Sequence, residues 1–209
     1  MQHKTKIILA TLTEKYSTLN SISESIFEAY QAIVECYTGG GKVMTCGNGG
    51  SAADALHIVG ELMKGFALPR KLSAEEQIYP EHLNAKLQGS LPAISLVNEV
   101  SLMTAFANDM DPNVVFAQQV HGYGAEGDVL IAISTSGNSE NIIYAAEVAK
   151  AKKIKVVSLS GECGGKLKAL SDVAICVPER EAYKVQELHL PIYHALCLAV
   201  ENEFFGENL

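Results

Sequence analysis

Residues 42–63 read KVMTCGNGGSAADALHIVGELM, and this stretch decides the fold. It passes from a short apolar segment, through three glycines, into a segment with the apolar periodicity of a helix. The first part, 42–46, is typical of a buried strand, and the last part, 52–63, is typical of a helix. A strand that runs through a glycine-rich turn into a helix is the building unit of a parallel α/β sheet.

The same alternation continues along the chain. Apolar segments predict four more strands, at 91–96, 129–134, 155–159 and 173–177. Helical patterns around them cover 21–37, 99–108, 139–152, 166–170 and 183–204. This order predicts an α/β fold: a five-stranded parallel sheet between two layers of helices. Ligands of such sheets bind at the carboxyl ends of the strands.

The length suits one α/β domain or two very small ones. We predict one domain, residues 1–209, with an N-terminal helix at 1–38. Hydrophobic residues make up 48% of the chain, which excludes global disorder. The formal charge of −8 argues against a nucleic-acid or anionic-membrane binder, because phosphate backbones require a basic face. A single phosphorylated small molecule remains compatible, since a few backbone N–H groups can hold one phosphate.

No apolar stretch approaches the ~18 residues of a membrane span, and the N-terminal apolar run is too short for a signal peptide. We therefore expect a cytoplasmic protein. The five cysteines are odd in number and include no C-x-x-C pair. Three of them, Cys36, Cys176 and Cys197, have apolar neighbours, which predicts buried thiols in a reducing compartment.

One segment, 66–90, breaks the alternation. It reads FALPRKLSAEEQIYPEHLNAKLQGS, with two prolines, many charges and no strand pattern. A connection of this length is usually a functional flap or a disordered excursion.

The loop after the first strand, 46–51, reads CGNGGS. Its glycines allow successive N–H groups to converge on an anion at a helix N-terminus. A dinucleotide site would also need an acidic residue at the end of a second strand, but Glu75 and Glu76 lie in the irregular segment. A Walker loop is excluded because no Gly-Lys-Ser/Thr follows.

A second loop, 133–139, reads ISTSGNS and again joins a strand to a helix. Four hydroxyls and one glycine in so short a span can surround a phosphate. The alternative is that Ser139 or Asn138 merely caps the helix. Two such loops in one sheet favour a phosphorylated polar ligand.

Candidate acid–base and metal groups lie on two helices. His57 and Glu61 share a helix face at i and i+4, where they could bind a metal or move protons. The alternative is a solvent-exposed pair of little energy. A further polar pair, Asn108-Asp109, follows a predicted helix; its alternative is a simple turn.

The last helix carries Gln186, His189 and His194. Gln186 and His194 are eight residues apart, about 12 Å along a straight helix, so they could barely reach one ion. Pro191 between them is expected to kink or interrupt the helix. Either the kink changes their separation or the two residues serve different sites, across a subunit interface for example.

Together these motifs resemble the sugar isomerase (SIS) domain family, in particular its phosphoheptose isomerases. The resemblance runs in the same order from the N-terminal helix to about residue 204, and only 66–90 breaks it. It implies a flavodoxin- or Rossmann-like three-layer fold. The motifs that carry it are CGNGGS (46–51), DALH (54–57) with Glu61-Leu62, Asn108-Asp109, STSGNS (134–139) and Gln186-Glu187-x-His189 with His194.

The resemblance implies interconversion of sedoheptulose 7-phosphate and D-glycero-D-manno-heptose 7-phosphate through an enediol, without a redox cofactor. It assigns Glu61 as the catalytic base and His194 as the catalytic acid. It implies one Zn²⁺ per subunit, a homotetramer with active sites at subunit interfaces, and a role in bacterial heptose biosynthesis. The phosphate ligands it implies are Ser134, Thr135, Ser136 and Ser139, with Ser51; the sugar-lining residues are Asn48, Gly49, Gly50, Asn108, Asp109 and Gln186; the zinc ligands are His57, Glu61, Gln186 and His194.

The family usually follows the Glu-Leu pair with Gly-Arg-aromatic, whereas this chain has Met63-Lys64-Gly65-Phe66. Three alternatives stay open: Lys64 replaces the missing basic residue, Arg70 replaces it, or neither does. Two other functions stay open: a non-catalytic SIS module that binds a phosphosugar or a protein, and an isomerase of another ketose phosphate. Non-catalytic relatives tend to lose the His/Glu set that this chain keeps.

Overall fold

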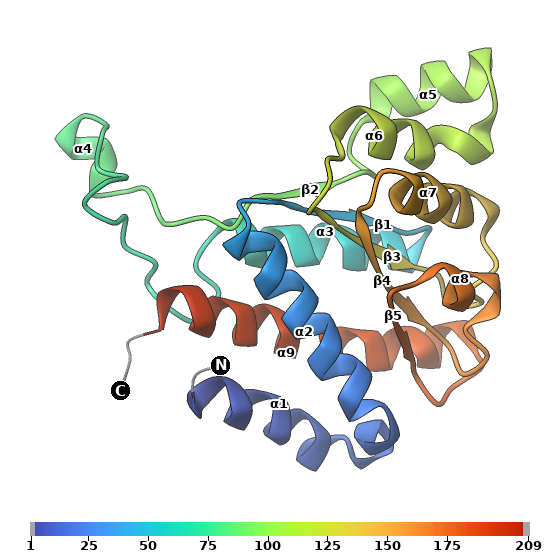
Figure 1. Ribbon diagram of the computed structural model, residues 1–209, viewed down its shortest axis with the longest axis horizontal. Helices are drawn as coiled ribbons and strands as arrows, with labels where there is room; N and C mark the ends of the chain where they lie inside the picture. Colours follow the sequence, from blue (N-terminus) through green and yellow to red (C-terminus); the bar gives the residue numbers. More distant parts are fainter. Residues whose placement is uncertain (1–2, 207–209) are drawn as a thin grey trace.

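The computed structural model describes residues 3–206 and contains a five-stranded sheet with all neighbouring strands parallel (Figure 1). The strand order is β2-β1-β3-β4-β5. The five predicted strands are confirmed, and none of their ends is shifted by more than two residues. Their bounds are β1 Val43–Cys46, β2 Ala93–Ser95, β3 Val129–Ile133, β4 Lys155–Ser160 and β5 Val173–Cys176.

Helices cover both faces of the sheet, as the alternation predicted. Successive side chains of a strand enter opposite cores: in β3, Ile131 packs with one helix layer and Leu130 with the other. One layer consists of α1 (His3–Lys15), α2 (Ser23–Thr38), α3 (Gly50–Met63) and α9 (Ala182–Phe205). The other consists of α5 (Val100–Asp109), α6 (Val115–Tyr123), α7 (Glu140–Ala151) and α8 (Gly165–Leu170).

The structure differs from the sequence expectations in two helical regions. The region 1–38 is two helices, α1 and α2, separated by a 3-10 helix at Ser17–Ile22, and its first two residues lie outside the described part. The helix α6, preceded by a 3-10 turn at Pro112–Val114, had no predicted counterpart. It is only nine residues long and rich in β-branched and aromatic residues, so its propensity signal is weak.

Pro191 does not interrupt α9, which is continuous from Ala182 to Phe205. A proline deprives the carbonyl four residues earlier, here that of Glu187, of its helical hydrogen bond. Glu187 lies on the exposed side of α9, where water can replace that bond. Packing of α9 against α1, α2 and α3 supplies the remaining stabilisation.

All five cysteines are free. Cys36 and Cys197 are buried as predicted, and Cys176 is half-buried. Among the described residues, none of the helices combines the length and apolar character needed to cross a bilayer.

The segment 66–90 contains no strand and one short helix, α4 (Glu81–Asn84), which projects away from the sheet (Figure 1). Its two ends nevertheless lie together. The N–H of Gly89 donates to the carbonyl of Arg70 at 2.8 Å, and the N–H of Gly65 donates to Gln88 Oε1 at 3.0 Å. The excursion therefore leaves and re-enters the fold at one place.

A buried ion pair anchors that place. The Arg70 side chain is fully buried and donates from Nε to Glu201 Oε1 of α9 at 2.7 Å. The same guanidinium donates to the carbonyls of Leu62 and Glu61 at 2.6 and 3.0 Å, which satisfies the C-terminal end of α3. Glu201 also accepts three backbone N–H groups, those of residues 66, 67 and 68.

We expect Glu201→Gln to lower the free energy of unfolding by roughly 3–5 kcal/mol, because it leaves the Arg70 charge buried without its counter-ion. Urea unfolding followed by circular dichroism measures the change. The control is Arg180→Ala, which removes an exposed ion pair with Glu162 and should leave the midpoint unchanged. Equal midpoints for Glu201→Gln and the unmodified chain would contradict the structural role of the pair.

Candidate active site

The two predicted anion-binding loops lie side by side at one edge of the sheet. They follow β1 and β3, which are hydrogen-bonded neighbours. In the strand order β2-β1-β3-β4-β5, the chain adds β2 on one side of β1 and then adds β3, β4 and β5 on the other side. The topological switch point therefore lies between β1 and β3, and ligands of such sheets bind there. Strand order and loop chemistry therefore indicate the same position.

The second loop gathers hydroxyls around a tight turn. Ser134 Oγ and Ser139 Oγ are 3.0 Å apart. Gly137 has a φ of +65°, and a Cβ there would lie 2.0 Å from the carbonyl oxygen of Gly164. Ser139 occupies the N-cap position of α7 but makes no capping bond, so helix capping does not account for its hydroxyl. Thr135 and Ser136 are partly exposed, so these hydroxyls are accessible to a ligand.

An amide pair joins the two loops. Asn48 and Asn141 exchange two hydrogen bonds, each of 2.9 Å, between their side chains. Asn141, in the first turn of α7, was not among the predicted site residues. The sequence contains no signal for it, because the pairing depends on the proximity of two loops 93 residues apart. Ser51, at the start of α3, is buried.

The acid–base candidates lie between α3 and α9, which run in the same direction across the sheet (Figure 1). His57 Nε2 is 3.1 Å from Glu61 Oε1. The ring centroids of His57 and His194 are 4.9 Å apart, and His194 Nε2 is buried without a hydrogen-bond partner in the described part of the chain. Three of the predicted residues are therefore brought together.

Gln186 lies at a different level of the two helices. Its side-chain amide packs on Gly50, where a Cβ would lie 2.6 Å from Gln186 Nε2. Gly50 is seven residues before His57, about two helical turns along α3. Within one chain, Gln186 thus contacts the first loop, whereas His194 contacts His57.

His189 has the structural role that a lone histidine on a core helix usually has. It is fully buried, and its Nε2 lies 3.3 Å from the carbonyl oxygen of Ser160. Burial lowers the pKa of His189 to about 4, so the ring is neutral at physiological pH.

The charges around Glu61 favour its ionised form. Burial alone would raise the pKa of Glu61, but Lys64 Nζ at 2.7 Å and His57 outweigh it, and the pKa lies below its usual value. Burial, aided by His57, lowers the pKa of His194. At neutral pH the site therefore holds a carboxylate beside a neutral imidazole.

Only one of the two basic candidates reaches this site. Lys64 contacts Glu61 directly. Arg70 does not replace the family's basic residue, because its guanidinium is enclosed by Glu201 and by the end of α3. The sequence could not separate the two, since Glu201 lies 131 residues further along the chain.

The predicted pair Asn108 and Asp109 lies apart from the acid–base cluster. Both are exposed at the end of α5, and Asn108 Nδ2 donates to Asp109 Oδ1 at 2.9 Å. In residues 3–206 they make no hydrogen bond to another predicted site residue. The helix α5 packs on the opposite layer, against α6 and the turn at 112–114 (Figure 1).

Metal-ligand chemistry is present but incomplete within one chain. His57 and Glu61 offer an imidazole and a carboxylate, and the unpartnered His194 Nε2 is a third donor of the type that zinc takes. Among residues 3–206, however, no group of three or more His, Cys, Asp or Glu side chains is arranged to hold a metal ion. The donor types therefore fit zinc, but the described residues of one chain do not form a complete zinc site.

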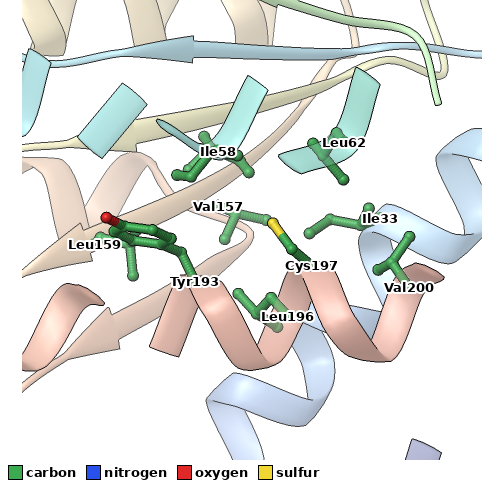
Figure 2. Close-up of a pocket in the computed structure, with 10 residues that line it drawn as sticks. Ile33, Ile58, Leu62, Val157, Leu159, Tyr193, Leu196, Cys197 and Val200 are labelled. Carbon is green, nitrogen blue, oxygen red and sulfur yellow. The ribbon is translucent and has the colours of Figure 1, made fainter. Parts of the chain in front are cut away.

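A small cavity enclosed by α2, α3, α9 and the sheet is part of the core and not a ligand site. It measures about 10 Å³, too little for more than a single water, and its lining is apolar. Figure 2 shows the ring of Tyr193 along its wall, with the hydroxyl pointing away from Cys197. The other labelled side chains come from α2, α3, α9 and the sheet.

Comparisons with known proteins show which family the chain resembles in sequence and in fold. A family model described as "SIS domain" matches residues 9–161. The phosphoheptose isomerase of Helicobacter pylori is 40% identical over 91% of this chain and 90% of its own length, and that of Nitratiruptor is 41% identical over 92% and 96%. A phosphoheptose isomerase structure from Francisella tularensis superposes with a TM-score of 0.77 at 34% identity, covering 97% of this chain and all of its own. One from Neisseria gonorrhoeae gives 0.75 at 32%, covering 92% and 94%.

Replacing Lys64 with Met should raise the pKa of Glu61, because it removes the cation that most stabilises the carboxylate. A carboxyl group with a lowered folded-state pKa stabilises the fold above its unfolded pKa and loses that contribution as pH falls through the folded value. In Lys64→Met, the contribution of Glu61 to the stability of the fold should therefore begin to fall at a higher pH than in the unmodified chain. The ¹³C shift of the Glu61 carboxyl, titrated by NMR, measures the pKa directly; Lys71→Met serves as the exposed-lysine control. An unchanged Glu61 titration would refute this electrostatic account.

Proposed function

The chain belongs to the SIS domain family, as an isomerase of the phosphoheptose isomerase type, and we propose that it interconverts sedoheptulose 7-phosphate and D-glycero-D-manno-heptose 7-phosphate. The observation that carries the proposal is the ionised Glu61 near the half-buried His194, whose Nε2 has no hydrogen-bond partner in the described part of the chain, with the hydroxyl loop at the neighbouring strand ends. Bacterial heptose biosynthesis, supplying cell-surface glycans, is the pathway in which such an enzyme acts.

Glu61 acts as the base in this proposal. Moving the carbonyl from C2 to C1 requires removal of a proton from C1 and its delivery to C2 through a cis-enediol. One carboxylate on one face of the substrate can perform both transfers. The lowered pKa keeps Glu61 ready to accept the proton at neutral pH.

His194 acts as the acid that serves the two oxygens. A neutral imidazole carries a proton on one nitrogen and a lone pair on the other. It can therefore donate to the C2 oxygen while it accepts the proton of the C1 hydroxyl. Nε2 of His194 has no hydrogen-bond partner in the described part of the chain, so this nitrogen can serve either this exchange or a metal ion.

The hydroxyl loop holds the phosphate. The hydroxyl oxygens of Ser134 and Ser139 lie 3.0 Å apart, and Thr135 and Ser136 lie between them in the loop. The loop leads into α7, and the first N–H groups of a helix are free to bind an anion. Ser51 supplies a further hydroxyl from the start of α3. These donors are neutral, so the overall charge of −8 does not oppose a single bound phosphate.

We further propose one Zn²⁺ per subunit, held by His57, Glu61 and His194 with Gln186, in a homotetramer with active sites at subunit interfaces. When bound, the metal would stabilise negative charge on the enediol oxygens as a Lewis acid. The donor types support the metal, and the incomplete ligand group within one chain supports a contribution from a neighbouring subunit.

Incubation with sedoheptulose 7-phosphate should produce the aldose heptose phosphate, measured by NMR of the anomeric protons. Glu61→Gln and His194→Ala should each lower kcat by roughly 100- to 10,000-fold, since each removes a proton-transfer group. Glu76→Gln, an exposed carboxylate in the 66–90 segment, is the control and should keep full activity. Full activity in Glu61→Gln would overturn the assignment of the base. Substrate binding without turnover in the unmodified protein would instead support a non-catalytic module.

Metal content and mass test the zinc and assembly proposals. The purified protein should contain one zinc per chain, and light scattering should give four times the mass of the chain. Chelation should reduce activity, and added Zn²⁺ should restore it; His57→Gln should lose the metal, whereas His82→Gln on α4 should retain it. Full activity of a metal-free protein, or a monomer that is fully active, would refute the respective proposal.

A further inference from the structure

Residues 71–88 form an arm that projects from the fold (Figure 1). None of the side chains at 71–88 is buried in the described structure, yet the arm has a defined shape. Asn84 holds its turn together: Nδ2 donates to the carbonyl of Tyr79 at 2.8 Å, and Oδ1 accepts from the N–H of Tyr79 at 3.2 Å. A segment that is ordered before it meets a partner loses less entropy on binding.

One face of the arm is apolar and exposed. The N–H of Leu87 donates to the carbonyl of Leu83 at 2.9 Å, so these two side chains lie one helical turn apart on the same face. Leu83 is 38% exposed and Leu87 is 44% exposed. Ile78 and Tyr79, which precede the turn, are exposed as well. Large apolar side chains gathered on an exposed surface mark an interaction site.

A groove of matching chemistry lies between α1 and α9. Its volume is about 470 Å³. Apolar side chains of both helices form its walls, and Ile7 of α1 and Leu190 of α9 are 50% and 41% exposed. A helical segment binds a groove of this kind through apolar side chains that are one turn apart. Leu83 and Leu87 have that spacing.

The charges of the arm and of the groove are opposite. Residues 72–85 contain three glutamates and neither Lys nor Arg. Among the described residues that line the groove, Lys4 and Lys15 are cationic and Glu187 is the single acidic group. Opposite potentials favour association of the two surfaces and fix their register. Since one chain carries both surfaces, a second copy of the chain supplies the partner for each.

The arm of one chain does not cover the groove of the same chain. Figure 1 shows α4 and α1 on opposite sides of the C-terminal end of α9. The buried pair of Arg70 and Glu201 fixes the base of the arm at that end. Arm and groove therefore both face outward, toward a neighbouring molecule.

We propose that the arm at 71–88 of one copy docks the face of Leu83 and Leu87 into the α1–α9 groove of a second copy. The contact extends the proposed assembly, and its consequence for the site rests on the proposed function. His194 is also part of the groove lining. A docked arm from the neighbouring copy would therefore shield the proposed catalytic acid from solvent on that side.

Cysteine cross-linking between two differently tagged chains tests the contact. One chain carries Leu83→Cys and the other Ile7→Cys, both with Cys163→Ser because Cys163 is exposed. The chains are coexpressed and oxidised mildly with copper phenanthroline. A disulfide-linked heterodimer should form on a non-reducing gel. The matched control replaces Ile7→Cys with Val100→Cys, on the exposed surface of α5, and should give no link to the arm.

Sedimentation measures the contribution of the apolar face and of the charges. Leu83→Glu should raise the Kd of self-association by roughly 10- to 100-fold, since it places a charge in an apolar groove. Lys4→Glu with Lys15→Glu should weaken association through repulsion by the acidic arm. Adding Glu75→Lys and Glu81→Lys to that variant should restore association. All five positions are exposed, so circular dichroism should show an unchanged fold.

The outcomes separate this inference from the proposed function. An oligomer that gives no link between positions 83 and 7 and keeps its mass in Leu83→Glu overturns the inference and leaves the proposed assembly standing. A disulfide between two Leu83→Cys chains in place of the heterodimer also overturns it, because the arms then pair with each other. The expected link and charge rescue in a protein without isomerase activity support the inference and refute the proposed function.

Discussion

The buried pair between Arg70 and Glu201 is the interaction on which the site depends. It joins the end of α3 to α9, and because these helices run in the same direction, it fixes their relative position along the axis. That position decides which side chains meet: Gly50 with Gln186, and His57 with Tyr193. A slip of one helical turn, about 5.4 Å, would separate every one of these partners.

Much of this fold could be predicted because the strands are short, continuous apolar segments and the helices have clear apolar periodicity. The break between α1 and α2 was not predicted, because a break within a helical region leaves a weak sequence pattern. The helix α6 was not predicted either, because a short helix also leaves a weak pattern. The sequence left Lys64 and Arg70 as alternatives, because the partner of Arg70 lies far along the chain, in the last helix.

The site was predictable where its chemistry is local. The hydroxyl loop and the pair of His57 and Glu61 are each encoded within a few residues. Asp54, which accepts a hydrogen bond from the Tyr193 hydroxyl, could have been predicted as a neighbour of the site, since it lies three residues before His57 on the same helix face. Tyr193 and Asn141 could not, because their partners are set by the packing of two helices and of two loops. The zinc, the tetramer and the roles of the site residues remain predictions.

The hydrogen bonds that join the two ends of the 66–90 segment have a consequence for evolution and engineering. Since the segment leaves and re-enters the fold at hydrogen bonds between Arg70 and Gly89 and between Gly65 and Gln88, the residues in between contribute little to the sheet. Loop-closure entropy grows slowly with length. The chain can therefore gain, lose or exchange residues here, and a reporter peptide or small domain inserted near residue 78 should be accommodated without disturbing α3 and α9.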